Sequence, residues 1–134
     1  MPVEIERKFL VLTDDWRAKC VRSVRLRDGL VVASDGRKVR VRVADDQATL
    51  TIKGARVGPG RDEFEYPIPL EDAERLLAHH CNGRLLIKTR HIVSEEDCLF
   101  EVDVYEGLLE GIVIAEIELS AIDQCFPRPT WLGD

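Results

Sequence analysis

The N-terminal stretch VEIERKFLV, at positions 3–11, decides how the rest of the chain is interpreted. Successive side chains of a β-strand point to opposite faces of a sheet, so a strand here places Glu4, Glu6 and Lys8 in one row. Such a row of mixed charge either faces water or lines a binding site. The stretch alone fits both interpretations, so the question becomes whether other strands repeat the pattern.

Six further stretches repeat the alternation, with charged or hydroxyl side chains at every second position. These residues are Lys38, Arg40 and Arg42, Thr51 and Lys53, Glu63 and Glu65, Lys88 and Arg90, Glu101 and Asp103, and Glu116 and Glu118. The residues between them are apolar, namely Val39, Val41, Leu50, Ile52, Phe64, Tyr66, Ile87, Val102, Val104, Ile117 and Leu119. An antiparallel sheet with one buried and one wetted face explains any single strand. Because the polar face is almost purely charged on all seven strands, we predict that these rows point into a polar channel if the sheet closes.

Helical signals are few. The clearest helix is expected over 70–83, where leucines recur at helical spacing, acids come early and a glycine follows. Shorter helices are expected after Thr13 and Ser120, which can cap them. We expect Gly29 to interrupt its strand, and Pro67 and Pro69 to end theirs. The chain is therefore predicted to be one mainly β (α+β) domain over residues 1–134, with an antiparallel barrel or a strongly curved sheet.

Composition limits the classes of function. The formal net charge of −6 over 134 residues does not attract nucleic acid or an anionic membrane, so neither is an expected partner and any anion binding must be local. Four scattered cysteines form no Cys-x-x-Cys pair and no signal-like segment is present, which favours reduced thiols in a cytoplasmic protein. No run approaches the roughly 18 apolar residues that span a bilayer.

Rows of both signs facing one channel predict a metal-bound polyphosphate as the ligand. Arginine and lysine bind phosphate oxygens, and the arginine fork does so with two N–H groups. Clustered carboxylates bind a hard cation such as Mg2+ or Mn2+, which can bridge phosphate oxygens. Phosphoryl transfer of this kind needs no serine, cysteine or histidine nucleophile.

The motifs, taken in order, resemble those of the CYTH superfamily, the triphosphate tunnel metalloenzymes, in their short bacterial form. They are VEIERKF with its Glu-x-Glu-x-Lys signature, VRVRV, LTIKG, EFEYPIP, DAERLL, IKTR, EVDVY, AEIEL and PTWLGD. The signature alone occurs by chance on exposed strands, whereas the ordered set covers nearly the whole chain. The resemblance implies an eight-stranded antiparallel β-barrel whose charged tunnel hydrolyses or cyclises triphosphate-bearing substrates with Mg2+ or Mn2+.

The resemblance also assigns roles to individual residues. It implies that the principal metal is held by Glu4, Glu6 and Glu118, and that a second metal or the attacking water is served by Asp103 and Glu116. It implies phosphate contacts from Lys8, Arg40, Arg42, Lys53, Lys88 and Arg90, with the three lysines as catalytic residues. It also implies that Glu63, Glu65 and Glu101 are supporting residues in the lumen of the barrel.

Two features depart from the family pattern. Leu30 stands where relatives often have a tyrosine, after the glycine that precedes the Arg-x-Arg strand, so a hydroxyl is missing. Relatives usually continue beyond PTWLGD into a further segment and a C-terminal helix, so the C-terminal segment is expected to be short and closure of the tunnel to be affected.

The predicted function is metal-dependent hydrolysis of a triphosphate-bearing small molecule, with inorganic triphosphate giving diphosphate and phosphate as the first choice. A class IV type adenylate cyclase is the alternative enzyme, and it needs a nucleoside pocket. Thiamine triphosphatase is a narrower alternative. A non-catalytic polyphosphate- or nucleotide-binding domain and a structural β-domain stay open as well. The resemblance allows a homodimer, although no apolar stripe identifies an interface.

Overall fold

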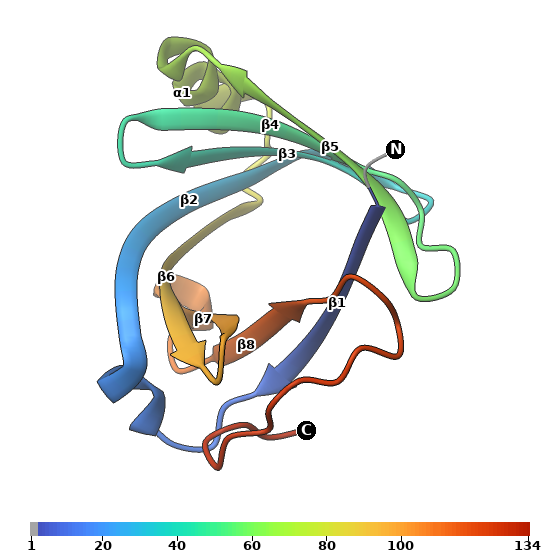
Figure 1. Cartoon of the computed structure of the whole chain (residues 1–134). Coiled ribbons are helices and arrows are strands. Elements are labelled where there is room, and N and C mark those ends of the chain that lie inside the picture. The colour runs from blue at the N-terminus through green and yellow to red at the C-terminus, as the bar shows by residue number, and fades with distance from the viewer. Residues whose placement is uncertain (1–2) are drawn as a thin grey trace. The chain divides into compact units, whose positions relative to one another are not determined.

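The structure is a computed structural model that describes residues 3–134. Within these residues it contains eight β-strands, one α-helix and two short 3-10 helices (Figure 1). Their bounds are β1 Val3–Leu10, η1 Asp15–Lys19, β2 Cys20–Ser34, β3 Arg37–Ala44, β4 Gln47–Lys53, β5 Gly60–Ile68, α1 Leu70–His79, β6 Leu85–Glu95, β7 Cys98–Tyr105, η2 Gly107–Leu109 and β8 Val113–Glu118. No helix in this part of the chain has both the length and the apolar character needed to cross a membrane.

The strands are hydrogen-bonded in the order β1-β5-β4-β3-β2-β6-β7-β8, and the order closes because β1 pairs antiparallel with β8. The predicted eight-stranded antiparallel barrel is therefore confirmed. The chain also divides into two compact units, and each has its own hydrophobic core. Unit 1 comprises the start of the chain as far as Glu4 together with Arg25–Ile87, and unit 2 comprises Ile5–Val24 together with Lys88–Asp134.

The core of unit 1 forms where α1 packs against β3 and β4 (Figure 1). Ala73 and Leu77 lie one turn apart on α1 and bury themselves against Val41 and Val43 of β3. These valines alternate with the charged residues of β3, so packing of the helix on one face leaves the charged side chains on the other.

The core of unit 2 contains two tryptophans. Trp16 of η1 is fully buried, and Trp131 packs edge-on against Phe100 with ring centroids 5.3 Å apart. The buried Glu95 carboxylate accepts hydrogen bonds from Trp131 Nε1 at 3.1 Å and from Lys19 Nζ at 2.9 Å. A charged group is therefore kept inside this core by two donors that satisfy it.

The helix expected over 70–83 is confirmed as α1, which ends at His79. The turn expected after Thr13 is the 3-10 helix η1, and Thr13 Oγ1 accepts a hydrogen bond from Asp15 N–H at 3.3 Å. The helix expected after Ser120 is wrong. The backbone N–H of Ser120 and its hydroxyl both donate to Gln124 Oε1, at 2.6 and 2.8 Å, and so close a non-helical turn.

The expected interruption at Gly29 is wrong, and the expected strand end is right at Pro69 but not at Pro67, because β5 ends at Ile68. Gly29 lies inside the continuous strand β2. It allows α1 to pack closely against the strand, because a Cβ at this position would lie 2.7 Å from the side chain of Leu77. Pro67 lies inside β5, opposite Thr49. Two residues expected on the core face are largely exposed, since Ile52 is 41% and Tyr66 is 53% accessible.

Candidate active site

In unit 1 the strand register places predicted site residues side by side. Arg40 on β3 lies opposite Thr51 on β4, and Thr51 lies opposite Glu65 on β5. In the neighbouring row Lys53 lies opposite Glu63. Residues directly opposite one another in adjacent strands share a face of the sheet. The charged face that the alternation predicts is therefore formed across β3, β4 and β5.

Two of the unit 1 cations are held by carboxylates. Arg42 donates from Nε and Nη2 to the two oxygens of Asp28, at 2.7 and 2.8 Å. Lys53 Nζ lies 3.1 Å from Glu4 and 3.4 Å from Glu63. Sequence reasoning missed Asp28, a buried residue on β2 opposite Arg42. Asp28 directly precedes Gly29 on the strand next to β3, and a carboxylate beside the Arg-x-Arg strand could have been recognised as a partner for Arg42.

The pKa values of Glu4 and Glu63 are shifted in opposite directions. Burial works to raise the pKa of Glu4, but a hydrogen bond with Glu63 and the ammonium of Lys53 hold that pKa below its ordinary value. Burial and the Glu4 carboxylate together raise the pKa of Glu63. Glu4 is therefore the member of the pair that stays ionised to lower pH, which suits the metal-ligand role predicted for it.

Arg40 differs from the other arginines of the site. Burial, and then the neighbouring charge of Arg42, lower the pKa of its guanidinium. Its Nη2 donates to Thr51 Oγ1 at 3.3 Å, while its buried Nε has no hydrogen-bond partner. Among the ion pairs of residues 3–134 none involves Arg40. Leu30 lies opposite Arg40 in the β2–β3 register.

In unit 2 a single carboxylate organises two predicted phosphate ligands. The Asp103 side chain is fully buried and accepts from Arg90 Nε and Nη2 and from Lys88 Nζ, each at 2.8 Å. Burial works to raise the pKa of Asp103, but Arg90 and Lys88 hold it below its ordinary value. Burial likewise opposes the charged form of Arg90, yet Asp103 holds the pKa of Arg90 above its ordinary value. Both cations are therefore fixed in place by one carboxylate.

The remaining carboxylates of unit 2 face one another across strands. Glu6 lies opposite Glu118, and Glu116 lies opposite both Glu101 and Lys8. Lys8 Nζ is 3.6 Å from Glu6 and 4.0 Å from Glu116, and its side chain is 60% exposed. Like charges directly opposite each other are destabilising, and the ammonium of Lys8 offsets part of this repulsion.

The predicted metal ligands are distributed over both units. Glu4 belongs to unit 1, and the other four belong to unit 2: Glu6, Asp103, Glu116 and Glu118. Among the described side chains, no three His, Cys, Asp or Glu residues gather closely enough to hold a metal ion. In this structure Glu4 and Asp103 contact lysine or arginine instead, so a metal at either one requires an exchange of partners.

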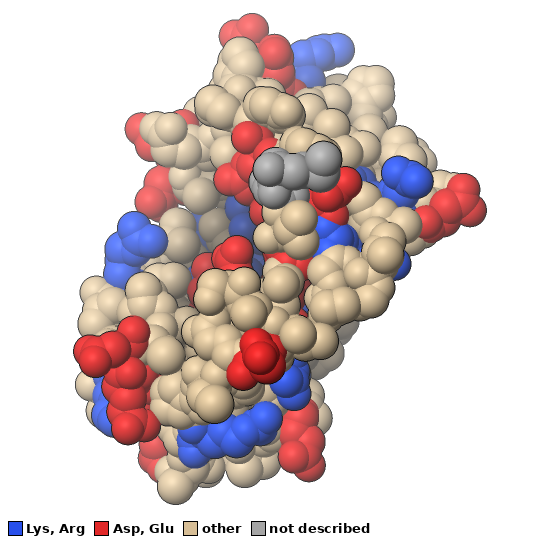
Figure 2. All heavy atoms as spheres, turned by 45° about the vertical axis from the view of Figure 1, so that its right-hand side comes forward, with Lys and Arg blue, Asp and Glu red and all other residues tan. Residues whose placement is uncertain are grey.

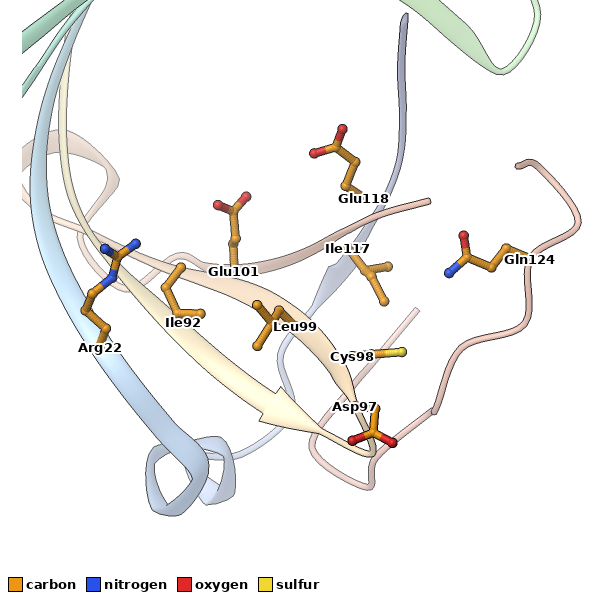
Figure 3. Close-up of a pocket in the computed structure, with 9 residues that line it drawn as sticks. All are labelled: Arg22, Ile92, Asp97, Cys98, Leu99, Glu101, Ile117, Glu118 and Gln124. Carbon is orange, nitrogen blue, oxygen red and sulfur yellow. The ribbon is translucent and has the colours of Figure 1, made fainter. Parts of the chain in front are cut away.

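A pocket of about 510 Å³ opens in unit 2 beside two of these carboxylates (Figure 3). It is lined by Arg22, Ile92, Asp97, Cys98, Leu99, Glu101, Ile117, Glu118 and Gln124. Figure 3 shows the Glu101 and Glu118 carboxylates pointing to the same side of the pocket and Asp97 lying toward the opposite end. Sequence reasoning did not find this pocket, because its lining comes from β2, β6, the β6–β7 turn, β7, β8 and the loop after β8. On the outer surface in Figure 2, acidic and basic side chains are interspersed with uncharged ones.

The CYTH domain family model matches residues 2–134 of the chain. The chain belongs to the CYTH domain family. It is similar to the inorganic triphosphatase of Acetivibrio thermocellus, with 38% identity over 133 residues, which cover 99% of this chain and 85% of the relative. It is also similar to the inorganic triphosphatase of Nitrosomonas europaea, with 35% identity over 135 residues, which cover 98% of this chain and 87% of the relative.

A solved structure of an inorganic triphosphatase superposes on this CYTH chain with a TM-score of 0.69 and 32% identity, covering 100% of this chain and 86% of the other. The family expected from the ordered motifs is confirmed. Triphosphatases of the CYTH family depend on a metal ion and act on triphosphates. The roles of individual residues in this chain stay predictions.

Proposed function

We propose that this CYTH chain is a divalent-metal-dependent triphosphatase and that inorganic triphosphate, cleaved to diphosphate and phosphate, is its first substrate. The names of its relatives support the reaction. The observation that carries the proposal in the structure is the half-buried guanidinium of Arg40, whose buried Nε has no hydrogen-bond partner.

A buried cation without a contacting counter-ion is costly, and so is a buried donor without an acceptor. A phosphate group answers both needs at once, because its oxygens accept from two N–H groups of a guanidinium and carry the compensating charge. The Arg40 site therefore favours an anionic, oxygen-rich ligand over a structural role for this charged face.

The residues of the chain divide the work of phosphoryl transfer. Arg40, Arg42 and Arg90 bind phosphate oxygens, and the latter two are oriented by carboxylates that grip both sides of the fork. The three catalytic lysines, Lys8, Lys53 and Lys88, spread the negative charge of the transferring group. The principal ion, Mg2+ or Mn2+, would be held by Glu4, Glu6 and Glu118, and when bound it would neutralise phosphate charge and activate water. Asp103 and Glu116 would help a second ion or orient the attacking water.

The alternative of adenylate cyclase activity needs room for a nucleoside. The unit 2 pocket of about 510 Å³ has the volume of a small-molecule site. Its nine lining residues include no aromatic ring on which a base could stack. Hydrolysis of inorganic triphosphate is therefore better supported than cyclisation of ATP. Thiamine triphosphate belongs in the substrate panel as a competitor.

The test is phosphate release from inorganic triphosphate, ATP and thiamine triphosphate with Mg2+ or Mn2+, measured beside cyclic AMP formation from ATP. We expect inorganic triphosphate to be hydrolysed fastest and EDTA to abolish turnover. Cyclic AMP as the main product would replace triphosphatase by cyclase, and metal-dependent binding without turnover would leave a non-catalytic binder.

The assigned metal ligands are tested by the double variant Glu4→Ala, Glu6→Ala. We expect it to lose turnover, whereas Glu71→Ala, which removes an exposed carboxylate in the first turn of α1, keeps it. Equal turnover in the wild type and the double variant would contradict the assigned metal ligands.

A further inference from the structure

We propose that Thr51 is a positioning residue that keeps Arg40 out of a direct ion pair with Glu65, so that the guanidinium stays available for the anionic ligand. The inference rests on the proposed function, because it concerns the ligand of Arg40. Thr51 is not among the residues to which the family resemblance assigns a role, and its side chain is fully buried.

The geometry places one hydroxyl between a cation and an anion. Thr51 on β4 lies opposite Arg40 on one side and Glu65 on the other. Its Oγ1 donates to Glu65 Oε2 at 3.2 Å and accepts from Arg40 Nη2 at 3.3 Å. A hydroxyl has a single proton, so donation to the carboxylate leaves a lone pair for the guanidinium and fixes the direction of both hydrogen bonds.

The other arginines of the charged face show what this spacer avoids. Arg42 is held by both oxygens of Asp28, and Arg90 is held by both oxygens of Asp103. Each of these guanidinium groups already has a carboxylate in direct contact. Arg40 instead meets a neutral hydroxyl, and its Nε is left without a partner.

This difference has a consequence for binding. A guanidinium paired with a carboxylate must weaken that pair before it can contact a phosphate, whereas Arg40 has no such pair to break. Its position is nevertheless held by Thr51, so the donor is oriented before the ligand arrives. Thr51 therefore contributes through Arg40 and does not itself need to contact the substrate.

The decisive variant is Thr51→Val, which removes the hydroxyl but keeps the β-branched shape. We expect triphosphate affinity, measured by calorimetry in EDTA, to fall about tenfold or more, as is typical for loss of a hydrogen bond to a charged group. In the metal-supported assay KM should rise by a similar factor while kcat changes less, because the catalytic lysines are untouched. Thr51→Ser, which retains the hydroxyl, should restore affinity to within about threefold of wild type.

The chain offers a matched control at Thr49. It lies two residues away on the same face of β4, opposite Arg42, and its side chain has no hydrogen bond in the described structure because Arg42 turns to Asp28. Thr49→Val should leave affinity and KM unchanged. A fall at Thr49→Val equal to that at Thr51→Val would overturn the inference, because both would then reflect a general disturbance of β4.

A double-mutant cycle with Arg40→Ala separates this inference from the proposed function. If Thr51 acts through Arg40, Thr51→Val causes no additional loss in the Arg40→Ala background. An unchanged affinity in Arg40→Ala itself would contradict the assigned phosphate contact. A normal Thr51→Val beside a weakened Arg40→Ala would contradict only the role of Thr51, and so would a full additional loss in the double variant.

Discussion

Replacing Asp103 with asparagine tests the charge arrangement of unit 2. Asp103 is fully buried and is the common acceptor for the fork of Arg90 and the ammonium of Lys88. The substitution keeps the shape of the side chain but removes its charge. It leaves two cations, whose side chains are 13% and 8% exposed, without their shared counter-ion.

The expected destabilisation is large. Breaking a buried ion pair by removing one partner lowers the free energy of unfolding by about 3–5 kcal/mol, and here the Glu101 carboxylate, 3.4 Å from Arg90, offsets part of that loss. The amide oxygen of asparagine can still accept one of these hydrogen bonds and so recovers part of the lost stability. Its NH2 group, however, is a donor and would face the N–H donors of Arg90 and Lys88. For a domain of this size the change corresponds to a fall in melting temperature on the order of 10 °C.

The assay is urea unfolding followed by tryptophan fluorescence, because Trp16 and Trp131 are both buried in the core of unit 2. Asp123→Asn is the matched control, since that carboxylate is exposed. We expect the control to stay within about 0.5 kcal/mol of wild type. A loss for Asp103→Asn no larger than that of the control would refute the view that this carboxylate holds the two cations.

The same variant predicts a pH dependence. Because the pKa of Asp103 in the folded state lies below its ordinary value of 3.8, its stabilisation is complete above that value and is lost as the pH falls through the lower folded-state pKa. The difference in unfolding free energy between wild type and Asp103→Asn should therefore be constant near neutrality and shrink in strong acid. A difference that grows as the pH falls would contradict the assigned sign.

Three further substitutions test the structure at other points. Gly29→Ala should lower the free energy of unfolding by about 1–3 kcal/mol in denaturant titrations, because the new Cβ would lie 2.7 Å from the side chain of Leu77; an unchanged midpoint would show that α1 moves away freely. Trp131→Phe should cost about 1–3 kcal/mol by the same measurement, since the buried Glu95 loses one of its two donors, and a neutral effect would mean that water replaces the indole. Arg40→Lys should raise KM for inorganic triphosphate about tenfold in phosphate-release assays, because lysine keeps the charge but loses the planar fork. An unchanged KM would mean that only the positive charge of Arg40 contributes to binding.

The faces of the strands could be predicted from sequence, because alternation is a local property of the backbone. Arg40, Thr51 and Glu65 lie in one row, as the parity of their strands predicts. The ordered motifs also led to the right family and to a closed barrel, because most of them mark a strand of a shared architecture. The helix after Ser120 failed because a side-chain amide outside the local pattern captured the capping group.

By itself, then, the sequence determined which strand residues share the charged face and most of those that share the apolar face, although Ile52 and Tyr66 are exposed. Only the tertiary structure decided how those charges pair: Asp28 with Arg42, Asp103 with two cations, and Thr51 between Arg40 and Glu65. Periodicity assigns a side chain to a face, whereas its partner depends on the register between strands that are distant in the chain. For that reason the stretch VEIERKFLV could predict a charged row, but it could not show that Glu4 contacts Lys53, which lies 49 residues away in the chain.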